Sequence, residues 1–373
     1  MFSYLSTSLK QPHLYKLQQQ LKPVLGNFAG YDMPMKFNYN SVKDVVTGVR
    51  NNGVGIFDVS HMGYIKLSSN NISNINKLLE KIFPINTDII KPNESKLSIL
   101  LNENGYVKDD LIISNINDYY YRLIVNASNK FDVLTLLNDH NLINKTKVDI
   151  NLEDKVILAI QGPKSQELLG NLLQKDFSNI FFNQNETINN RLEISRTGYT
   201  GEDGFELYIE PELGIKFYKL LIEHKNTYDN IYFGGLIERD ILRLEAGLCL
   251  SGNEFSNNMK IDFPDLNMNF LIGKKRKNKG DFIGYNKLIT DSEYIRTGFF
   301  SNKPVRPNNI IYNKHKHNIG FITSSNKSYN LNKFISMGYI RKDNLNDIFV
   351  MNKNNQIHLH QTNLPFIPHK LYK

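Results

Sequence analysis

The sequence predicts a mixed α+β protein of several domains whose C-terminal domain consists of β-strands. The chain has 373 residues, which is enough for two or three domains. Residues 97–126 contain three β-rich runs separated by turn signals, and runs with helical spacing lie on both sides. From about residue 285 onward the chain contains only short strand-like runs with turns between them, a pattern typical of a small barrel or sandwich.

The middle of the chain predicts an antiparallel meander. Residues 97–126 read LSILLNENGYVKDDLIISNINDYYYRLIVN. The Asn104-Gly105 pair is a strong hairpin signal, and the polar NIND segment predicts the second turn. The flanking runs NISNINKLLEKIF and FDVLTLLNDHNL predict helices. We therefore expect one α+β domain over residues 51–149.

The remaining segments alternate between predicted strands and predicted helices. VILAIQGPKSQELLGNLL predicts a strand, a Gly-Pro break and a helix, and RLEISRTGYTGEDGFELYIEP predicts two strands around a glycine-containing loop. Ile237, Ile241, Leu244 and Leu248 have spacings of four, three and four, which predicts one apolar helix face. We expect residues 1–50 and 150–270 to form a discontinuous α+β domain, and residues 285–373 to form the β-domain.

The charge of the chain is compatible with several kinds of partner. The net charge is +8 and the pI is about 9.1, which fits a nucleic acid, an acidic protein or a polyanionic ligand. Asn-rich patches with Lys, such as NNISNINK and MNKNNQ, indicate a compositional bias that accounts for part of this charge. The sequence has neither an RNP-like aromatic strand nor a GXXG clamp, so we expect no nucleic-acid partner. No apolar run approaches the roughly 18 residues of a membrane span, so we expect no membrane segment.

The cysteine content and the N-terminal composition indicate the cellular compartment of the protein. Cys249 is the only cysteine, so neither an intramolecular disulfide nor a cysteine metal cage can form, and a reducing compartment is indicated. The first 31 residues contain no Asp or Glu and carry Lys10, Lys16 and Lys22 with several Ser and Thr. This composition is similar to that of an organelle transit segment, although it contains no Arg. A polar N-terminal arm is an equally good interpretation.

Common catalytic motifs are absent, and polar clusters at predicted strand ends take their place. The sequence contains no phosphate loop, no G-x-S-x-G elbow and no H-E-x-x-H metal helix. The polar clusters are FDVSHMG (57–63), KDDLIIS (108–114), LIVNAS (123–128), GYTGEDGFELY (198–208) and LIERDILRLEAGLCL (236–250).

These clusters, with QGP, DFIG, PVRP and LPFIP, occur in the same order as in the aminomethyltransferase, or T-protein, family of the glycine cleavage system. The resemblance covers residue 14 to the C-terminus. It implies a three-domain α+β cloverleaf, with a ferredoxin-like unit and a small C-terminal β-barrel or sandwich around a central folate cavity. It also implies that a methylene carbon passes from the aminomethyl-lipoyl arm of H-protein to tetrahydrofolate, with release of ammonia. The resemblance further implies a monomer in the mitochondrial matrix that requires no metal.

The adjacent acids of the KDDLIIS cluster cannot both face one cavity. Successive side chains of a strand point to opposite faces, so Asp109 and Asp110 must separate. The family's catalytic acid matches the second position, so the resemblance assigns catalysis to Asp110. We expect Asp109 to serve the turn or an outer face. A fixed carboxylate suits this chemistry because positive charge develops while the folate nitrogen attacks.

The resemblance also assigns a set of folate-binding residues. A carboxylate can accept two parallel hydrogen bonds from an aminopyrimidinone edge, which suits Glu206 as the pterin anchor. Arg243 lies one helical turn after Arg239, and we expect it to be a structural brace. The residues that match family ligand contacts are Glu206, Arg239, Asn126, Tyr199, Met62 and, shifted by one position at the C-terminus, Tyr372.

Two further features have competing interpretations. His61 could be a general base, but the family's motif at this position shapes the cavity wall. A basic run could be an ordinary solvated loop or a docking patch for H-protein, which is typically acidic in this family. Its members are Lys274, Lys275, Arg276, Lys277 and Lys279.

The sequence departs from the family pattern at several positions near the predicted site. Tyr31 replaces a Trp, Tyr106 replaces a Gly, Glu238 replaces a small residue and Ser251 stands where relatives often carry Tyr. The alternative is the related folate-binding protein of iron–sulfur cluster maintenance, which is not a transferase. Its K-G-C-type motif is absent here, because Cys249 lies within RLEAGLCL.

Overall fold

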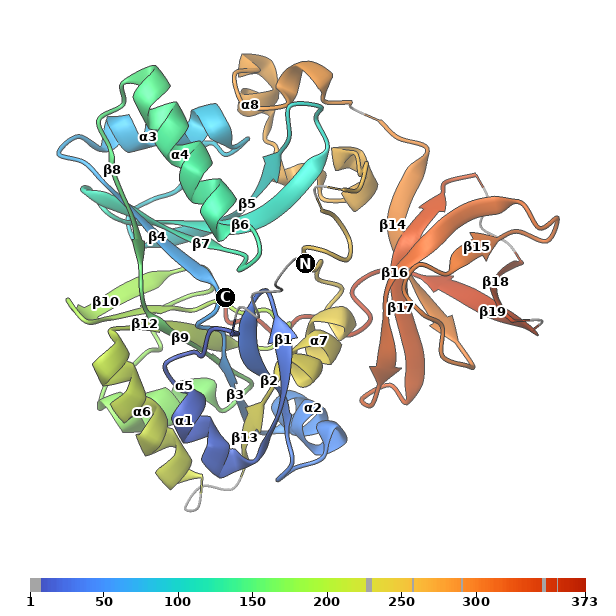
Figure 1. Cartoon of the computed structure of the whole chain (residues 1–373), viewed down its shortest axis with the longest axis horizontal. Helices are drawn as coiled ribbons and strands as arrows, with labels where there is room; N and C mark the ends of the chain where they lie inside the picture. Colours follow the sequence, from blue (N-terminus) through green and yellow to red (C-terminus); the bar gives the residue numbers. More distant parts are fainter. Residues whose placement is uncertain (1–7, 226–229, 257, 290, 344–346, 354) are drawn as a thin grey trace, which may run out of the picture.

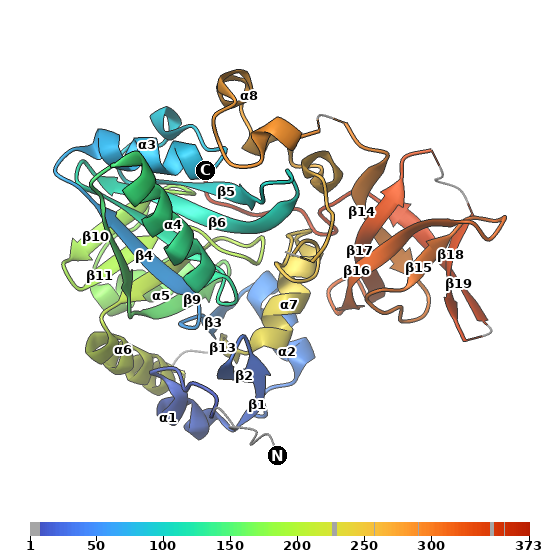
Figure 2. The ribbon, with the colours of Figure 1, turned by 45° about the horizontal axis from the view of Figure 1, so that its top comes forward.

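The chain folds into three lobes, each of which is built on its own sheet (Figure 1). The computed structural model describes residues 8–373 except 226–229, 257, 290, 344–346 and 354. The predicted mixed α+β class and the predicted C-terminal barrel are confirmed. In two views the barrel lies to one side of the other two lobes (Figure 1, Figure 2).

The first lobe contains a six-stranded sheet. Its order is β10 (Asn185–Asn189), β11 (Leu192–Ser195), β12 (Gly204–Ile209), β9 (Val156–Gln161), β3 (Val54–Asp58), β13 (Ile231–Gly234). Neighbours are antiparallel, except that β3 and β13 are parallel. The hairpin of β1 (Pro23–Phe28) and β2 (Tyr31–Phe37) lies beside this sheet.

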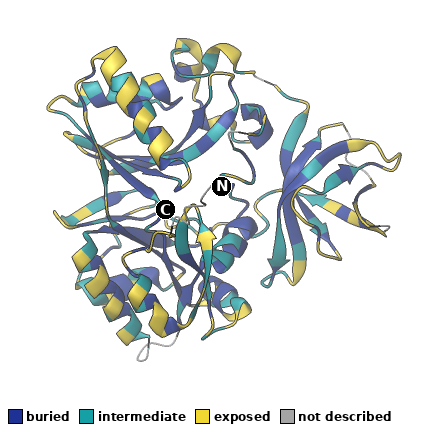
Figure 3. Cartoon of the chain, viewed as in Figure 1, coloured by how far each residue is buried: buried dark blue, intermediate teal, exposed yellow. Residues whose placement is uncertain are grey.

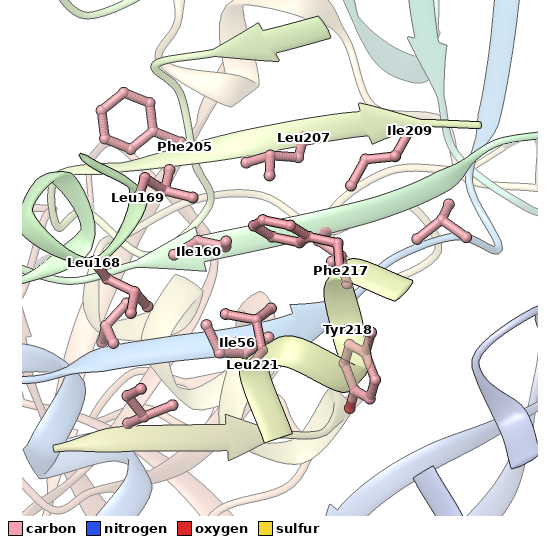
Figure 4. Packing of buried hydrophobic residues seen from close by; sticks show 14 of the residues in the cluster. Ile56, Ile160, Leu168, Leu169, Phe205, Leu207, Ile209, Phe217, Tyr218 and Leu221 are labelled. Carbon is pink, nitrogen blue, oxygen red and sulfur yellow. The ribbon is translucent and has the colours of Figure 1, made fainter. Parts of the chain in front are cut away.

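Three helices cover one face of this sheet. They are α1 (Tyr15–Gln18), α5 (Ser165–Leu173) and α6 (Pro211–His224). Leu169 of α5 and Phe217 and Leu221 of α6 pack against Ile160 and Leu207 of the sheet (Figure 4). The other face packs against the second lobe and against α2 (Val42–Asn51) and α7 (Leu236–Glu245). The sheet is therefore buried on both faces.

The second lobe contains the predicted meander. Its sheet has the order β5 (Glu94–Leu101), β6 (Val107–Asn117), β7 (Tyr120–Val125), β4 (Gly63–Ser68), β8 (Asp149–Glu153), and all neighbours are antiparallel. Gly105 has a φ of +81° at the tip of the first hairpin, where glycine is favoured. Helices α3 (Ile72–Ile82) and α4 (Lys130–Asn144) cover the outer face, and α4 exposes much of its surface to solvent (Figure 3).

The expected domain boundaries at residues 51 and 149 do not coincide with these sheets. Strand β3 belongs to the first sheet and β8 belongs to the second. Every residue of β3 is buried, and such a strand requires a central position in its sheet. We propose that the first lobe comprises residues 8–61 and 154–270, and the second lobe residues 62–153.

The C-terminal lobe is a closed barrel of six strands. Its order is β14 (Tyr294–Ser301), β17 (Lys333–Arg341), β16 (Asn318–Ser328), β15 (Ile310–Tyr312), β18 (Ile348–Asn352), β19 (Asn355–Thr362), and β19 pairs with β14. Ile311, Ile322, Ile340 and Val350 lie in its core. Closure leaves no free sheet edge in this lobe.

Helix α7 connects the first lobe to the barrel. It begins at Leu236, and the carboxylate of Glu238 accepts a hydrogen bond from the Gly235 N–H at 2.9 Å, which caps the helix. The helix ends at Glu245, and Gly247 follows with a φ of +66°. The predicted apolar helix face therefore stops before Leu248.

The last residues of the chain return from the barrel to the first lobe. The Ile367 N–H donates to the Glu245 carbonyl at 2.9 Å, and the Lys370 N–H donates to the Gly201 carbonyl at 2.8 Å. The Lys370 ammonium also lies 3.4 Å from the buried carboxylate of Glu202. This C-terminal strap joins the two lobes by main-chain hydrogen bonds.

Candidate active site

Adjacent positions of β6 alternate between the two faces of the sheet, so Asp109 and Asp110 have different neighbours even though one amide contacts both carboxyl groups. Asp110 shares a face with Ile112, which packs toward the first lobe. Asp109 shares a face with Leu111 and Ile113, which pack under α3 and α4. The expectation that Asp109 serves a turn or an outer face is wrong, because its exposure is only 1%. The helices cover this face of the meander, so an acid on it is buried.

One amide binds both carboxylates. The Asn126 side-chain NH₂ donates to Asp109 Oδ1 at 2.8 Å and to Asp110 Oδ1 at 2.9 Å. Asn129, at the start of α4, donates to the other oxygen of Asp109 at 2.8 Å. Asn126 ends β7, which pairs directly with β6, so the sheet register brings it to the acids. The two carboxyl groups are thus held in fixed positions beside each other.

Burial and mutual repulsion make this carboxyl pair easy to protonate. Burial and the neighbouring Asp109 carboxylate raise the pKa of Asp110 to about 7. Burial also raises the pKa of Asp109, while hydrogen bonds from Asn129, Ser251 and Asn126 oppose that rise. The pair therefore exchanges a proton near neutral pH, as an acid–base group requires.

Glu206, Arg239 and Tyr199 form a second cluster. Tyr208 donates its phenolic O–H to Glu206 Oε2 at 3.0 Å, and Arg239 Nη2 lies 4.0 Å from Glu206 Oε1. The Arg239 guanidinium lies 4.9 Å from the centre of the Tyr199 ring. The Tyr199 O–H donates to the Cys249 carbonyl, and burial together with nearby Asp110 raises the pKa of Tyr199. The charge of Asp110 in the first cluster therefore acts on Tyr199 in the second cluster.

Arg239 has unused hydrogen-bonding capacity in this cluster. Its Nη1 is buried and has no hydrogen-bond partner among the described residues. A buried N–H without an acceptor is costly, because its desolvation is not compensated. An acceptor on a bound ligand would remove this cost.

His61 and Met62 lie in the connection between β3 and β4. Burial, with the positive charges of Arg239 and Lys130, lowers the pKa of His61 to about 3. The imidazole is therefore neutral at physiological pH and is a weak proton acceptor, which disfavours the general-base interpretation. Met62 packs against the hydrophobic cluster that contains Tyr64 and Ile124, and its role as a wall of the ligand site stays a prediction.

Tyr372 does not join the other predicted site residues. Its ring stacks on Phe181 at 5.7 Å and lies 3.7 Å from the Arg196 guanidinium. Its O–H donates to the Ser178 carbonyl at 3.2 Å. The C-terminal strap carries Tyr372 past the site to the first lobe, so the shifted match to a ligand contact is not supported.

The basic run forms helix α8 (Lys274–Lys279), and its five cations are not equivalent. Arg276 is buried and pairs with Glu80 at 3.2 Å and with Asp281 at 2.9 Å. Lys279 pairs with the same two acids, and Lys275 pairs with Asp88. Only Lys274 and Lys277 are exposed and have no ion pair among the described residues. Arg276 is thus a structural residue and is unavailable for docking.

Arg243 is a brace, and it has a partner that sequence reasoning missed. Both Arg243 and Glu254 are fully buried, and their charged groups are 3.0 Å apart. Arg243 also donates to Ser324 of the barrel at 2.7 Å, and Glu254 accepts from Thr323 and Ser324 at 2.6 Å each. An acid in the SGNE segment directly after an apolar run was the available sequence signal.

Other features of the surface do not coincide with these clusters. Two hollows of about 460 and 320 Å³ contain none of the predicted folate or catalytic residues. Among the described residues, no group of three or more His, Cys, Asp or Glu side chains is arranged to hold a metal ion. No described helix combines the length and apolarity that a membrane crossing requires.

Comparisons with known proteins cover nearly the whole chain. Residues 14–276 match the model described as GCVT N-terminal domain, and residues 296–367 match the glycine cleavage T-protein C-terminal barrel domain. The mitochondrial aminomethyltransferase of Pisum sativum is 32% identical over 98% of this chain and 91% of the relative. The aminomethyltransferase of Thermoanaerobacter sp. (strain X514) is 31% identical over 93% of this chain and 95% of the relative.

A solved structure shows the same fold over nearly the full length. The glycine cleavage system aminomethyltransferase T from Bartonella henselae superposes with a TM-score of 0.89 at 27% identity, covering 98% of this chain and 100% of that one. Nothing in these comparisons favours the iron–sulfur maintenance alternative. The chain belongs to the aminomethyltransferase, or glycine cleavage T-protein, family.

Proposed function

We propose that this chain transfers the methylene carbon of the aminomethyl-lipoyl arm of H-protein to tetrahydrofolate. The bonds from the methylene carbon to the lipoyl sulfur and to the amine nitrogen both break, and the carbon forms bonds to two folate nitrogens. The two folate N–H protons are balanced by those gained in ammonia and in the dihydrolipoyl thiol. The single observation that supports this most strongly is the Asp110 carboxyl, held by Asn126 with a pKa of about 7.

In this proposal Asp110 assists the attack of the folate amine. As an anion it stabilises the positive charge that develops on the attacking nitrogen, and it accepts the proton that the nitrogen loses. The Asn126 amide holds the carboxylate through a hydrogen bond to Asp110 Oδ1 at 2.9 Å, and its nitrogen also lies 3.1 Å from the Asp110 carbonyl oxygen. A fixed anion needs no reorganisation at the moment of reaction, which is the source of its catalytic benefit.

Glu206 and Arg239 are proposed to hold the pterin ring. Glu206 Oε2 accepts a hydrogen bond from the Tyr208 O–H. Among the described residues, Arg239 Nη2 approaches Glu206 Oε1 only to 4.0 Å, so this oxygen can accept from a ligand. A carboxylate accepts well from the N3–H and 2-amino group of an aminopyrimidinone. The partnerless Nη1 of Arg239 would donate to an oxygen or ring nitrogen of the same ligand. Met62 and Tyr199 would supply apolar and aromatic contacts.

An activity assay tests the proposed function directly. The protein is mixed with aminomethyl-loaded H-protein, and ammonia release is measured with and without tetrahydrofolate. We expect release to depend on both substrates and to yield 5,10-methylenetetrahydrofolate in equal amount. Release without folate, or folate binding without release, would exclude the proposed reaction.

H-protein is proposed to dock partly on α8. Replacing Lys274 and Lys277 together with Gln should raise the KM for H-protein by about 3–10-fold at low salt, because each removes an exposed charge that attracts an acidic partner. The KM for folate should stay constant. Replacing Lys303 and Lys314 together with Gln is the matched control, because both lysines are exposed on the barrel. This control should leave the KM for H-protein unchanged. An unchanged KM for H-protein at low salt would show that α8 does not dock it.

The proposed compartment is the mitochondrial matrix. The relative from Pisum sativum is described as mitochondrial. The predicted transit-like segment begins with residues 1–7, which lie outside the described residues. Fractionation of cells that express the full chain would test this location.

A further inference from the structure

Arg122 is a fully buried arginine in the interface between the first two lobes. It belongs to β7, the strand of the second lobe that leads to Asn126, and its exposure is 0%. Its Nη1 donates to Glu193 Oε2 of β11 at 2.8 Å. Its Nη2 donates to Ser195 of β11 at 2.6 Å and to Asn185 of β10 at 2.9 Å. These hydrogen bonds to the first lobe fix the plane of the guanidinium group.

The guanidinium of Arg122 covers one face of the Tyr208 ring. Its central carbon lies 3.9 Å from the ring centre. Tyr64 contacts the same ring with its edge, at 5.9 Å between the ring centroids. Tyr208 is only 2% exposed, and a cation attracts an aromatic face more strongly when both are removed from water. The Tyr208 ring is therefore held firmly in one position.

Tyr208 in turn binds the proposed pterin anchor. Its O–H donates to Glu206 Oε2 at 3.0 Å. Burial and the Glu206 carboxylate raise the pKa of Tyr208, so the hydroxyl keeps its proton at neutral pH and can donate it. Ser195, which accepts a hydrogen bond from Arg122, is the cross-strand partner of Glu206 in the β11–β12 ladder. Arg122 thus contacts both the ring that holds Glu206 and the strand position beside it.

The orientation of Glu206 matters for its proposed task. A carboxylate that accepts two parallel hydrogen bonds must direct both oxygens at the ligand. Each oxygen can accept more than one hydrogen bond, so Oε2 can bind the Tyr208 O–H and a ligand together. Arg239 approaches the other oxygen only to 4.0 Å, which is too long for a hydrogen bond. Without the Tyr208 O–H, a ligand would have to order the carboxylate as it binds.

We propose that Arg122 and Tyr208 are positioning residues for the pterin ring. Arg122 holds the Tyr208 ring, and the Tyr208 O–H holds Glu206 in the orientation that accepts from the ligand. This inference rests on the proposed function, because it takes Glu206 as the pterin anchor. Arg122 belongs to the second lobe and Glu206 to the first, so the affinity for folate depends on how these two lobes pack together.

Calorimetric titration with tetrahydrofolate tests the inference without H-protein. Tyr208→Phe keeps the ring and removes the O–H, so it should raise the Kd for tetrahydrofolate by about 5–20-fold. The KM for H-protein and the kcat at saturating folate should change by less than about twofold, because only folate binding is affected.

Tyr64→Phe is the matched control. It removes another buried tyrosine O–H that donates to a glutamate in the same interface, but the acceptor is Glu193, at 3.0 Å. Glu193 still accepts from Tyr120 at 2.7 Å in this variant. The control should keep the parental Kd for tetrahydrofolate, even where its stability falls. An equal rise in Kd in the two variants would overturn the inference, because it would reflect general loosening of the interface.

A second ligand shows whether the effect of Tyr208 passes through Glu206. The ligand is a tetrahydrofolate analogue with a methyl group in place of the 2-amino group, which removes one hydrogen bond to Glu206. The parent should bind it about 10-fold more weakly than tetrahydrofolate. Tyr208→Phe should shrink this difference, because a misoriented carboxylate makes less use of the amino group. An undiminished difference in the variant would count against the inference.

Arg122→Lys tests the other positioning residue. Lysine keeps a cation near Glu193 but has no planar group to cover the Tyr208 ring. The Kd for tetrahydrofolate should rise about 3–10-fold, and adding Arg122→Lys to Tyr208→Phe should weaken binding by less than about twofold, because both changes act through one O–H. If Arg122→Lys does not fold, Tyr208→Phe still decides.

The outcomes separate this inference from the proposed function. A parental Kd in Tyr208→Phe would overturn the inference, while folate-dependent ammonia release by the parent would still support the function. Tight folate binding by the parent without ammonia release would reject the function, and the raised Kd of Tyr208→Phe would still support the positioning role.

Discussion

Replacing Asp110 with Asn is expected to lower the rate of folate-dependent ammonia release by about 10²–10⁴. The change removes the anion while the Asn126 amide can still donate to the new side-chain oxygen, so the geometry is retained. The folate KM should stay nearly constant, because Glu206 and Arg239 are unchanged. Steady-state kinetics with loaded H-protein measures both values. Full activity in this variant would remove Asp110 from the mechanism.

The same change is expected to stabilise the protein at neutral and alkaline pH. The folded-state pKa of Asp110 is raised to about 7 from an unfolded value near 4, so ionisation favours the unfolded state. This cost grows between about pH 4 and pH 7 and is complete above pH 7. Asp110→Asn should therefore raise the unfolding free energy by about 1–3 kcal/mol at pH 8 and by much less at pH 4. Denaturant titrations at the two pH values check this.

Asp109→Asn is the matched control, because it changes the neighbouring carboxyl group. Asp109 raises the pKa of Asp110, and Glu254 adds to the same effect from the first lobe. Without Asp109, the acidic limb of the pH–rate profile should move to lower pH, while the rate at high pH should stay far above that of Asp110→Asn. A limb that does not move would show that the activity is not governed by the ionisation of Asp110.

Replacing Arg243 with Met is expected to cost about 3–5 kcal/mol of stability. The change leaves the fully buried carboxylate of Glu254 without its cation, 3.0 Å away, and removes the hydrogen bond to Ser324. Since these contacts join α7 to β16, the barrel should separate from the first lobe before either unfolds alone. Differential scanning calorimetry should show an earlier transition, and limited proteolysis should cut the connection between the lobes sooner.

Arg191→Met provides the matched control for this prediction. Arg191 also pairs with a glutamate, Glu212, but at 3.8 Å and with both side chains more than half exposed. Exposed pairs contribute about 0–1 kcal/mol, so the control should unfold like the parent. Equal stability of the two variants would show that the Arg243 contacts do not hold the lobes together.

Much of this fold could be predicted from local signals in the sequence. The Asn104-Gly105 turn and the alternating runs around it predict the meander, and the Asn102 N–H closes this hairpin by donating to the Tyr106 carbonyl at 3.0 Å. The cluster of Asn126 with the acids also follows from the strand register, since β7 pairs with β6.

The features that could not be predicted depend on long-range packing. Whether Asp109 faces solvent depends on α3 and α4, which cover one face of the sheet. Arg276 lies in a run of lysines, and only its contacts with Glu80 and Asp281 distinguish it from them. Tyr372 was matched by its distance from the last proline, but the path of the strap is set by hydrogen bonds to residues far away in sequence. The roles of Glu206, Arg239 and Asp110 stay predictions.

The C-terminal strap has a consequence for how the interface between the lobes tolerates sequence change. Its main-chain N–H groups at Ile367 and Lys370 donate to the carbonyls of Glu245 and Gly201. Main-chain hydrogen bonds do not depend on which side chains the strap carries. Substitutions in the strap should therefore leave this connection in place, whereas cleavage of the chain before Ile367 would remove it.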